Sequence, residues 1–460
     1  MEKVQRKVMG TDFTEGKVFP MLIRFMLPFM IANILNSIYN TVDTIIIGQF
    51  VGSVGIVSVN MGGRMLNLFT QIGLTLAGGG QVLISQLYGA KRREEFNSTI
   101  GTLFTEMIVL SVVMGIVTFL CAEPLLNWLN TPAESMPGAL SYLRITCLGL
   151  PLIFGYNAVS SVLRGMGDSR SPLIFIAIAA VINLIGDIVF IVVFHLGAAG
   201  TAIATVLGQG LSLVFSIVTL YRKRERFGFD FRLRSFAVDW SRLWVMLKIG
   251  FPMTLRVILI NLTQMYMISF VNLYGLAESA AYAIGDKIVH LTTIFTTSAR
   301  QAGGGMVGQN VGAGKYDRVR EIVRACLIVT VGAALLLSAA SLLFPNFIFS
   351  LFDDSPDVLA YAVVFMRITS LIFILGAIMS PFECVITGTG HSVLAFIGGI
   401  LDGVIFRFGF SYLFVAILDM GVSGFFLGDA MARFGPIIVG MAYYFSGAWR
   451  RRKRLVEDPG

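Results

Sequence analysis

The chain has 460 residues, of which 56% are hydrophobic and only 13% charged, and its formal net charge is +8. Soluble proteins are about 25% charged, so this composition excludes a water-soluble core. Lysines and arginines occur in short clusters between long apolar runs rather than on one basic face, which argues against a nucleic-acid partner. The four cysteines lie in or beside apolar stretches without CxxC spacing. They therefore predict neither a disulfide framework nor a zinc site.

Twelve apolar segments are long enough to cross a membrane as helices, which takes about 20 residues. In chain order they are residues 21–47, 55–82, 98–121, 138–162, 171–195, 198–221, 246–273, 281–308, 322–346, 359–386, 393–417 and 421–446. The predicted fold is an all-α integral membrane protein with twelve transmembrane helices. The first twenty residues are polar and charged, unlike a cleavable signal peptide, so insertion is expected to begin with the first span.

Positive charge marks alternate connections between the spans. These connections and the C-terminal tail carry Lys91, Arg92, Arg93, Arg164, Arg170, the arginines between 222 and 234, Lys315, Arg318, Arg320 and the run 450–454. The other connections carry acids and almost no positive charge: Glu123, Glu134, Glu278, Asp353, Asp354, Asp357 and Asp419. Positive residues are retained on the cytoplasmic side. We therefore expect a multi-pass protein of the cell membrane with both termini in the cytoplasm.

The longest polar segment begins at Arg222 and separates six spans from six. It predicts an N-lobe at residues 1–221, a cytoplasmic linker at 222–245, a C-lobe at 246–446 and a basic cytoplasmic tail at 447–460. Trp240 and Trp244, beside Arg242, fit a segment that lies in the membrane interface before the seventh span.

The two halves also repeat in sequence. GGGQVLISQLYGAKR (78–92) resembles GGGMVGQNVGAGK (303–315), and YLRIT (142–146) matches FMRIT (365–369). LPFMIANILN (27–36) likewise resembles GFPMTLRVILIN (250–261). Parallel six-helix repeats are a transporter architecture, with lobes related by a pseudo-two-fold axis along the membrane normal and substrate held between them.

Two acids in the first half indicate an ion site, because a charged side chain inside a bilayer costs about 3 kcal/mol or more. Asp43 ends a polar stripe on the first span, while Asn183 and Asp187 lie one helical turn apart on the fifth. A carboxamide beside a carboxylate suits a hard cation, and a buried carboxylate can equally carry a proton. The sequence does not choose between Na⁺ and H⁺. The alternative is that Asp187 only pairs with a buried arginine.

Polar stripes on three spans are candidates for lining a substrate cavity. They comprise Asn33, Asn36 and Asn40 on the first span, Arg64, Asn67 and Gln71 on the second, and Asn261, Gln264 and Met267 on the seventh. Spacings of three and four place each set on one helical face. Hydrogen bonding between packed helices is the alternative for the asparagines. Arg64 is a candidate counter-charge for Asp43. Met267 occupies the repeat position of Asp43, so an ion site is expected in the first half only.

The second half carries charged groups of its own. Asp286, Lys287 and His290 are interpreted as a local charge cluster at the external end of the eighth span, with a second polar site as the alternative. Arg407 and Glu383 are weaker cavity candidates. The glycine triplets at 78–80 and 303–305 lack the preceding strand and following Lys-Ser/Thr of a phosphate loop, so close helix packing or hinging explains them better.

Four segments together resemble the multidrug and toxic compound extrusion (MATE) transporters, particularly their bacterial DinF-like branch. They are LPFMIANILNSIYNTVDTIIIGQFVG from 27, SQLYGAKR from 85, LRGMGDSRSP from 163 and NLIGDIVFIVVFHLGAAGTAIAT from 183. The resemblance implies two six-helix lobes that alternate between outward-facing and inward-facing states and export cationic, amphipathic drugs in exchange for Na⁺ or H⁺.

The resemblance also assigns roles to particular residues. Asp43 looks like the family's acid in the first span, Asn183 and Asp187 look like the pair in the fifth, and Thr205 looks like the hydroxyl residue near the cation. The acid that the NorM-like branch carries in the seventh span is absent here, which argues against a cation site in the second lobe.

We therefore expect a cation-coupled antiporter that works as a monomer in membrane lipid on a small-molecule substrate, with Na⁺ or H⁺ as coupling ion and no cofactor. Cation binding at Asp43 and Asp187 is expected to change the bend of the first span around Pro28 and to release the drug outward. Alternatives are a lipid-linked precursor flippase of the same superfamily or export of one metabolite. An enzyme is disfavoured because no HExxH or GxSxG motif is present. A channel is disfavoured because buried acids occupy only one lobe.

Overall fold

The computed structural model describes residues 10–456, and within that range the secondary structure is entirely helical. Eleven helices in this range are long and apolar enough to span a membrane. The twelfth, α10 (Leu276–Gly312), is also long enough to span a membrane, at 37 residues. It is more polar because it carries Glu278, Asp286, Lys287 and Arg300. The predicted all-α architecture with twelve spans is confirmed.

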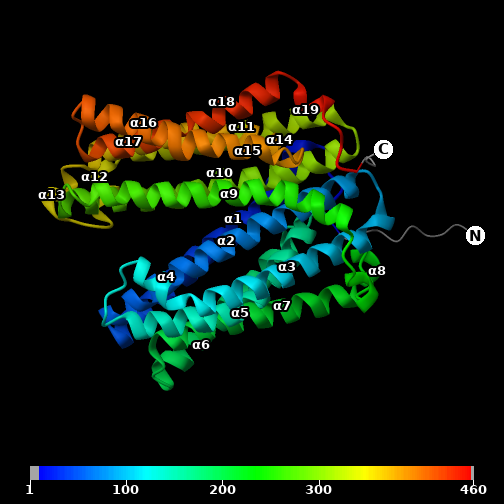
Figure 1. Ribbon diagram of the computed structural model, residues 1–460. Helices are drawn as coiled ribbons and strands as arrows, with labels where there is room; N and C mark the ends of the chain where they lie inside the picture. Colours follow the sequence, from blue (N-terminus) through cyan, green and yellow to red (C-terminus); the bar gives the residue numbers. More distant parts are fainter. Residues whose placement is uncertain (1–9, 457–460) are drawn as a thin grey trace, which may run out of the picture. The chain divides into compact units, whose positions relative to one another are not determined.

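The chain divides into two compact units. Unit 1 consists of Pro28–Gly250 and the short stretch that ends at Asp12. Its long helices are α2 (Ser53–Gly89), α3 (Phe96–Leu120), α5 (Met136–Gly165), α6 (Arg170–Asp187), which continues as the π-helix η2 (Ile188–Val193), and α7 (Gly197–Arg222) (Figure 1). Shorter elements are η1 (Arg93–Glu95), α4 (Ala122–Trp128), α8 (Arg224–Phe227) and η3 (Leu233–Phe236).

Unit 2 consists of Phe13–Leu27 and the chain from Phe251 onward. Besides α10 it contains α11 (Tyr316–Leu343), α14 (Ala362–Gly388), α15 (Ser392–Ile400), α16 (Arg407–Tyr412), α17 (Val422–Ala432) and α18 (Phe434–Phe445) (Figure 1). Two π-helices, η4 (Leu401–Phe406) and η5 (Leu413–Ile417), join and extend α15 and α16 into one span. Shorter helices are α12 (Pro345–Ser350), α13 (Pro356–Leu359) and α19 (Ala448–Arg451).

Two helices are each shared by both units. The division falls between Leu27 and Pro28 inside α1 (Val18–Val51), and between Gly250 and Phe251 inside α9 (Trp240–Val271). Each division lies at or next to a helix-interior proline, Pro28 or Pro252. Proline removes one backbone hydrogen bond and permits bending at that point. The unit boundaries therefore coincide with the turns of these two helices at which proline permits bending.

The residues just before α1 belong to unit 2 and are bonded to the end of α10. The Phe13 amide donates to Gln309 Oε1 at 2.9 Å, and Asn310 Nδ2 donates to the Phe13 carbonyl at 3.1 Å. Arg318 at the start of α11 donates to the Gly16 carbonyl at 3.0 Å. These bonds fix the leading segment of the first half on the second unit.

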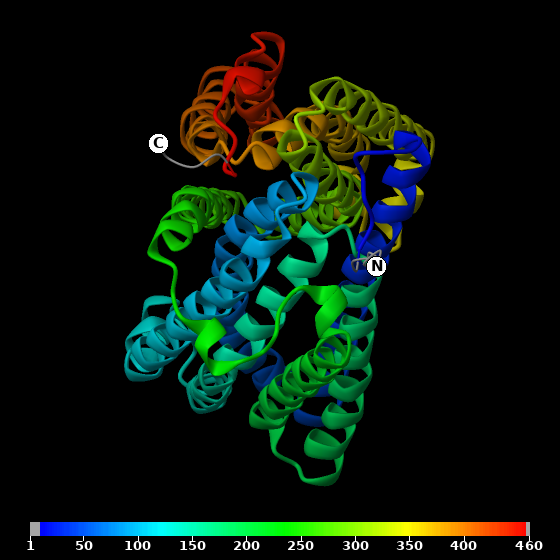
Figure 2. The ribbon, with the colours of Figure 1, turned by 90° about the vertical axis from the view of Figure 1, so that its right-hand side faces the viewer.

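The segment before α9 is bonded in the same way to unit 1. The Asp230 amide donates to Asn97 Oδ1 at 3.1 Å, and Thr105 Oγ1 donates to the Phe236 carbonyl at 2.7 Å. Partial burial of Asp239 opposes its ionisation, but hydrogen bonds from Arg242 hold the pKa of this carboxyl below its usual value. Figure 2 shows this segment crossing in front of the unit 1 helices. Helix α9 begins at Trp240, inside the stretch predicted as linker, so Trp240 and Trp244 lie on its first turns.

The first glycine triplet lies where α2 packs against the first turns of α9. A Cβ added to Gly79 would lie 2.4 Å from the Met246 carbonyl oxygen, and one on Gly80 would lie 2.7 Å from a Leu103 methyl carbon. One on Gly78 would meet nothing within 4 Å. Close packing therefore explains Gly79 and Gly80 but not Gly78.

Exchange of Gly79 for alanine is expected to destabilise the protein by about 1–3 kcal/mol, because the new methyl group would press on backbone rather than on a side chain that can move. Gly78→Ala is the matched control. It should leave stability unchanged or raise it, because alanine is favoured over glycine in a helix by about 1 kcal/mol. Thermal unfolding of the two purified variants measures the difference, and equal midpoints would show that this contact is not tight.

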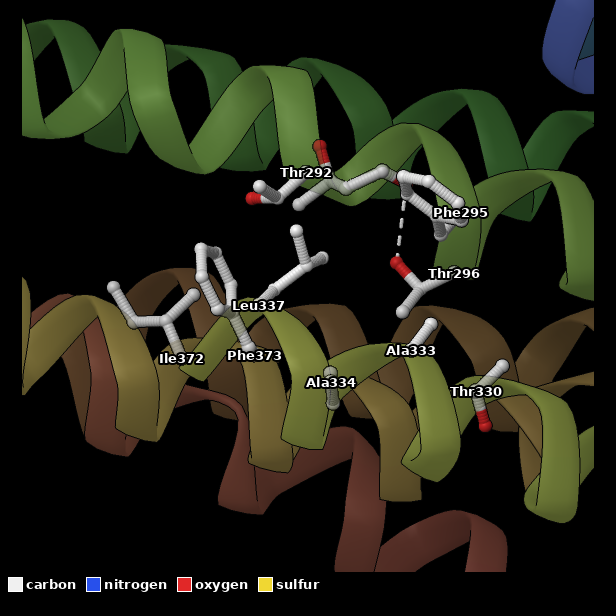
Figure 3. Close-up of a pocket in the computed structure, with 11 residues that line it drawn as sticks. Thr292, Phe295, Thr296, Thr330, Ala333, Ala334, Leu337, Ile372 and Phe373 are labelled. Atoms are coloured by element: carbon white, nitrogen blue, oxygen red, sulfur yellow. Dashed lines mark hydrogen bonds between the residues drawn. The ribbon is translucent and has the colours of Figure 1, made fainter. Parts of the chain in front are cut away.

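Unit 2 contains a small pocket among α10, α11 and α14 (Figure 3). Thr292, Phe295, Ala334, Leu337 and Phe373 are among its lining residues. Hydroxyl groups at the pocket donate to backbone carbonyls, as Thr292 does to Ile288 at 2.9 Å. Such internal bonding leaves apolar walls without a charged group to recognise a ligand. The pocket is therefore a gap in helix packing.

Candidate cation and substrate sites

Unit 1 brings the four predicted ion-site residues into one buried cluster. Asp43 on α1, Asn183 on α6 and Asp187 on α6 are 7%, 4% and 0% exposed. The carboxyl groups of Asp43 and Asp187 lie in each other's electrostatic field. Asn183 Nδ2 donates to Thr205 Oγ1 on α7 at 3.3 Å. Three helices thus supply two carboxyl groups, one carboxamide and one hydroxyl to a single site.

Small residues allow α6 and α7 to approach closely enough to form this cluster. A Cβ on Gly208 would lie 2.7 Å from the Ala179 carbonyl oxygen, and one on Gly186 would lie 2.8 Å from Ala204 Cβ. Close backbone approach at small residues is the usual means of helix association in membranes. Because Asn183 and Asp187 are one turn apart, the face of α6 that meets α7 also faces Asp43.

Four oxygen atoms in the cluster lack a hydrogen-bond donor. They are Asp43 Oδ1, Asn183 Oδ1 and both carboxylate oxygens of Asp187. Buried acceptors without partners are costly, and two nearby carboxylates cannot both be ionised without a compensating positive charge. Oxygen ligands are those that hard cations prefer, and a proton would satisfy the same carboxyls. The residues present therefore fit a bound Na⁺ or H⁺.

Two tyrosines near the cluster were not predicted from sequence. Tyr142 on α5 is 5% exposed and lies beside Asp43, Asp187 and Thr205. Tyr39 lies one turn before Asp43 and is in its electrostatic field. The position of Tyr39 on the stripe that ends in Asp43 was a usable signal. For Tyr142 the only signal in the sequence is that the matching position of the second repeat is Phe365, which has no hydroxyl group.

The predicted cavity-lining residues of unit 1 lie on partly open faces. Asn33 and Asn36 are half-buried, and Asn40, Arg64, Asn67 and Gln71 are exposed. Polar side chains on spanning helices avoid lipid and face protein or water. Within the described chain no ion pair joins Arg64 to Asp43, and the role of Arg64 as a counter-charge stays a prediction.

The seventh-span candidates divide between the surface and the core of unit 2. Asn261 and Gln264 on α9 are exposed. Met267 is only 4% exposed and packs inside the unit, so it presents no open surface for a substrate. Its burial follows from its apolar side chain, whereas Asp43 at the matching position of α1 is held by the polar groups around it.

Unit 2 contains a buried ion-pair network that sequence reasoning did not assemble. Glu383 on α14 pairs with Arg256 on α9 and, at 3.5 Å, with Arg300 on α10. Arg407 on α16 pairs with Asp402 and Asp429. The sequence indicates Glu383 and Arg407 as charged residues inside spans, but it does not indicate their partners on other helices, such as Arg256 and Asp429.

The predicted charge cluster on α10 extends toward this network. Asp286, Lys287 and His290 are exposed, and Asp286 lies in the electrostatic field of His290, Arg407 and Arg433. Among residues 10–456 no group of three or more His, Cys, Asp or Glu side chains is placed to hold a metal ion.

Comparison with known proteins gives a match in each half of the chain. A family model described as MatE matches residues 28–189 and, a second time, residues 252–413. The chain belongs to the MatE family. The two matched stretches cover the two repeats seen in the sequence, and the resemblance to MATE transporters is confirmed.

Relatives of this MatE chain match it over most of their length. The probable multidrug resistance protein YpnP of Bacillus subtilis is 27% identical over 450 residues, which are 97% of this chain and 99% of that protein. YoeA of the same organism, also a probable multidrug resistance protein, is 26% identical over 80% of this chain and 81% of its own. An outward-facing multidrug resistance MATE transporter structure superposes with a TM-score of 0.90 at 20% identity, over 97% of this chain and 100% of that one.

Membership in the MatE family has direct consequences for the kind of protein this is. MATE proteins are multi-pass membrane transporters of small molecules, so the chain is a transporter and not an enzyme. The structural match confirms the fold, with twelve spanning helices in two lobes.

Proposed function

We propose that this protein exports small organic compounds, mainly cationic and amphipathic ones, from the cell by exchange against an inward-flowing Na⁺ or H⁺. Relatives named as multidrug resistance proteins support the general class of substrate. The coupling ion binds at Asp43, Asn183, Asp187 and Thr205. The substrate contacts the open polar faces of α1 and α2, including Asn36, Asn40 and Gln71.

The observation that carries this proposal is the set of four buried oxygen atoms without donors at the Asp43–Asp187 cluster. No arginine or lysine is paired with either acid within the described chain, which argues against a purely structural ion pair. A site that needs positive charge and contains none of its own must take it from solution. Movement of the cation or proton through this site, down its electrochemical gradient, then supplies the free energy for export.

Exchange follows if the cation and the drug favour different conformations of the transporter. Binding between Asp43 and Asp187 ties α1 to α6, which favours one bend of α1 at Pro28. The division of α1 between the units falls at that proline, so the change of bend occurs at the boundary of unit 1. The drug is released in the state that the cation favours, and each ligand excludes the other.

Ethidium efflux from energised, drug-sensitive cells tests the proposal. Na⁺ and proton gradients are imposed separately, and cells with an empty vector provide the control. Efflux that depends on one gradient supports cation-coupled export and identifies the ion. If a well-expressed protein drives no efflux under either gradient, a lipid-linked precursor or a single metabolite becomes the better substrate hypothesis.

The orientation of the chain is tested by its own cysteines. Cys121 at the end of α3 is exposed, whereas Cys147, Cys326 and Cys384 are buried. With both termini in the cytoplasm, Cys121 lies on the external side. A membrane-impermeant maleimide is therefore expected to label intact cells at this position, and Cys121→Ser should remove the label. Labelling only after permeabilisation would reverse the proposed topology.

A further inference from the structure

Backbone conformation places the two repeats in register. Residues with positive φ recur in the second repeat at a fixed distance along the chain. Before the fifth span of each unit this distance is 223 residues, as for Gly52 with Gly275 and Gly167 with Gly390. After the fifth span it is 224 residues, as for His195 with Asp419 and Gly197 with Gly421. The second repeat therefore contains one additional residue within this span.

The π-helix η4 accounts for the additional residue. The π-helices η2 (188–193) and η5 (413–417) correspond at the spacing of 224, whereas η4 (401–406) matches an uninterrupted part of α6. A π turn closes over one more residue than an α turn, and such bulges occur frequently at functional sites. Downstream of η4 the spacing is 224, so Arg407 corresponds to Asn183, Ser411 to Asp187 and Asp429 to Thr205.

The corresponding pairs make corresponding contacts. In unit 1, Asn183 donates to Thr205 at 3.3 Å. In unit 2, the guanidinium of Arg407 forms an ion pair with Asp429 at the same two positions. Arg407 Nη2 also lies 2.9 Å from Asp402 Oδ1, a carboxylate that η4 itself presents. The Arg407 side chain is only 6% exposed. A positive charge between two carboxylates thus stands where unit 1 has a cation site.

The charges of the unit 2 cluster balance. Arg433 Nη2 lies 3.9 Å from the second carboxylate oxygen of Asp429, so two arginines face two aspartates. Asp286 on α10 and Glu383 on α14 add two acids to the field. Arg256 and Arg300, which pair with Glu383, add two arginines. The guanidinium group does not deprotonate in proteins. The cluster therefore holds its compensating charge permanently and has no need of an ion from solution.

We propose that Arg407 is a tethered cation, which occupies the second-lobe counterpart of the coupling site and restricts ion coupling to the first lobe. This inference rests on the proposed function for the first-lobe site. It confines ion binding to the first-lobe site and assigns to Arg407 the role of a specificity-determining residue. Removal of its charge should leave Asp402 and Asp429 without the one guanidinium that pairs with both of them. Arg433 and Arg256, which also face these aspartates, would not fully compensate their charge, so the cluster would require an exchangeable cation.

The test uses the full-length protein with Asp43→Asn and Asp187→Asn, in which the first-lobe site cannot respond. Thermal-unfolding midpoints are compared in sodium chloride and in choline chloride of equal ionic strength, and at acid and alkaline pH. With Arg407 intact, Na⁺ is expected to have no effect beyond that of choline. Adding Arg407→Asn should produce a saturable rise of a few degrees with Na⁺ or with protons, because a ligand that binds only the folded state stabilises it.

Two controls separate a coupling role from a structural one. Arg407→Lys keeps the charge and should show no ion response, while Arg407→Asn combined with Asp429→Asn restores neutrality and should also show none. A folded Arg407→Asn variant that does not respond would overturn the proposal. So would a specific ion response with Arg407 intact that Asp402→Asn removes.

Equilibrium binding of radioactive sodium, or proton uptake, by the wild-type protein provides a measurement that needs no Arg407 variant. Ion binding that is lost when Asp43→Asn and Asp187→Asn are combined is expected, and binding that persists in this double variant would contradict the proposal. If the wild type binds no ion, the proposed first-lobe function fails. The response created by Arg407→Asn still decides the role of Arg407, because it is measured without the first-lobe acids.

Discussion

Replacement of Asp187 by asparagine is expected to reduce gradient-driven efflux by about tenfold or more, which is the scale of a coupling free energy between two ligands. The side chain is fully buried, and both of its carboxylate oxygens lack donors. Asparagine keeps the size of the side chain but removes the charge that attracts the cation. Asp43→Asn should have a similar effect, because the two carboxyl groups interact across α1 and α6.

Efflux of ethidium under each imposed gradient, normalised to the amount of protein in the membrane, measures this effect. Asp419→Asn is the matched control, because it makes the same chemical change at an exposed turn. Asp419 has a φ of 50°, a conformation that asparagine tolerates. Full cation-driven efflux by a normally expressed Asp187→Asn variant would show the proposed mechanism to be wrong.

Replacement of Glu383 by glutamine is expected to destabilise the protein by about 3 kcal/mol or more, because it breaks buried ion pairs from one side. Glu383 is 4% exposed and is bonded to Arg256, with Arg300 at 3.5 Å. The variant would leave both guanidinium groups without a carboxylate, and Arg433 adds further repulsion. The thermal-unfolding midpoint of the purified protein measures the loss.

Arg300→Gln is the companion variant for this prediction. The Arg300 side chain is 31% exposed, and its removal leaves the Arg256–Glu383 pair intact. Its effect on the midpoint should therefore be much smaller than that of Glu383→Gln. Equal effects would mean that Glu383 acts through packing rather than through its charge.

The spanning helices could be predicted from sequence because a bilayer requires about 20 apolar residues for each crossing. Even α10 was found by length, although its charged residues lower its hydropathy. The unit boundaries were harder to predict. They fall inside α1 and α9, where the apolar sequence continues through Pro28 and Pro252 without a change in composition.

Part of the ion cluster was predictable because acidic side chains inside a membrane cost free energy and are therefore rare in spanning helices. Asp43 and Asp187 drew attention for that reason, and the structure brings them together. The roles of the arginines in unit 2 were not predictable in the same way. Pairs such as Arg407 with Asp429 join different helices, which helical periodicity cannot reveal. The additional residue in η4 also shifted the repeat spacing and concealed the correspondence of Arg407 with Asn183.

The division of α1 and α9 between the units bears on how such a chain could have arisen. Phe13–Leu27 belongs to the unit formed mostly by the second half, and the segment before Phe251 belongs to the other unit. In a six-helix ancestor built in this way, each chain would have completed its fold only in a dimer, because its leading segment would pack in the unit of the other chain. Duplication and fusion would make that exchange internal. Two half-length fragments, cut between the repeats, should therefore fold and transport only when they are produced together.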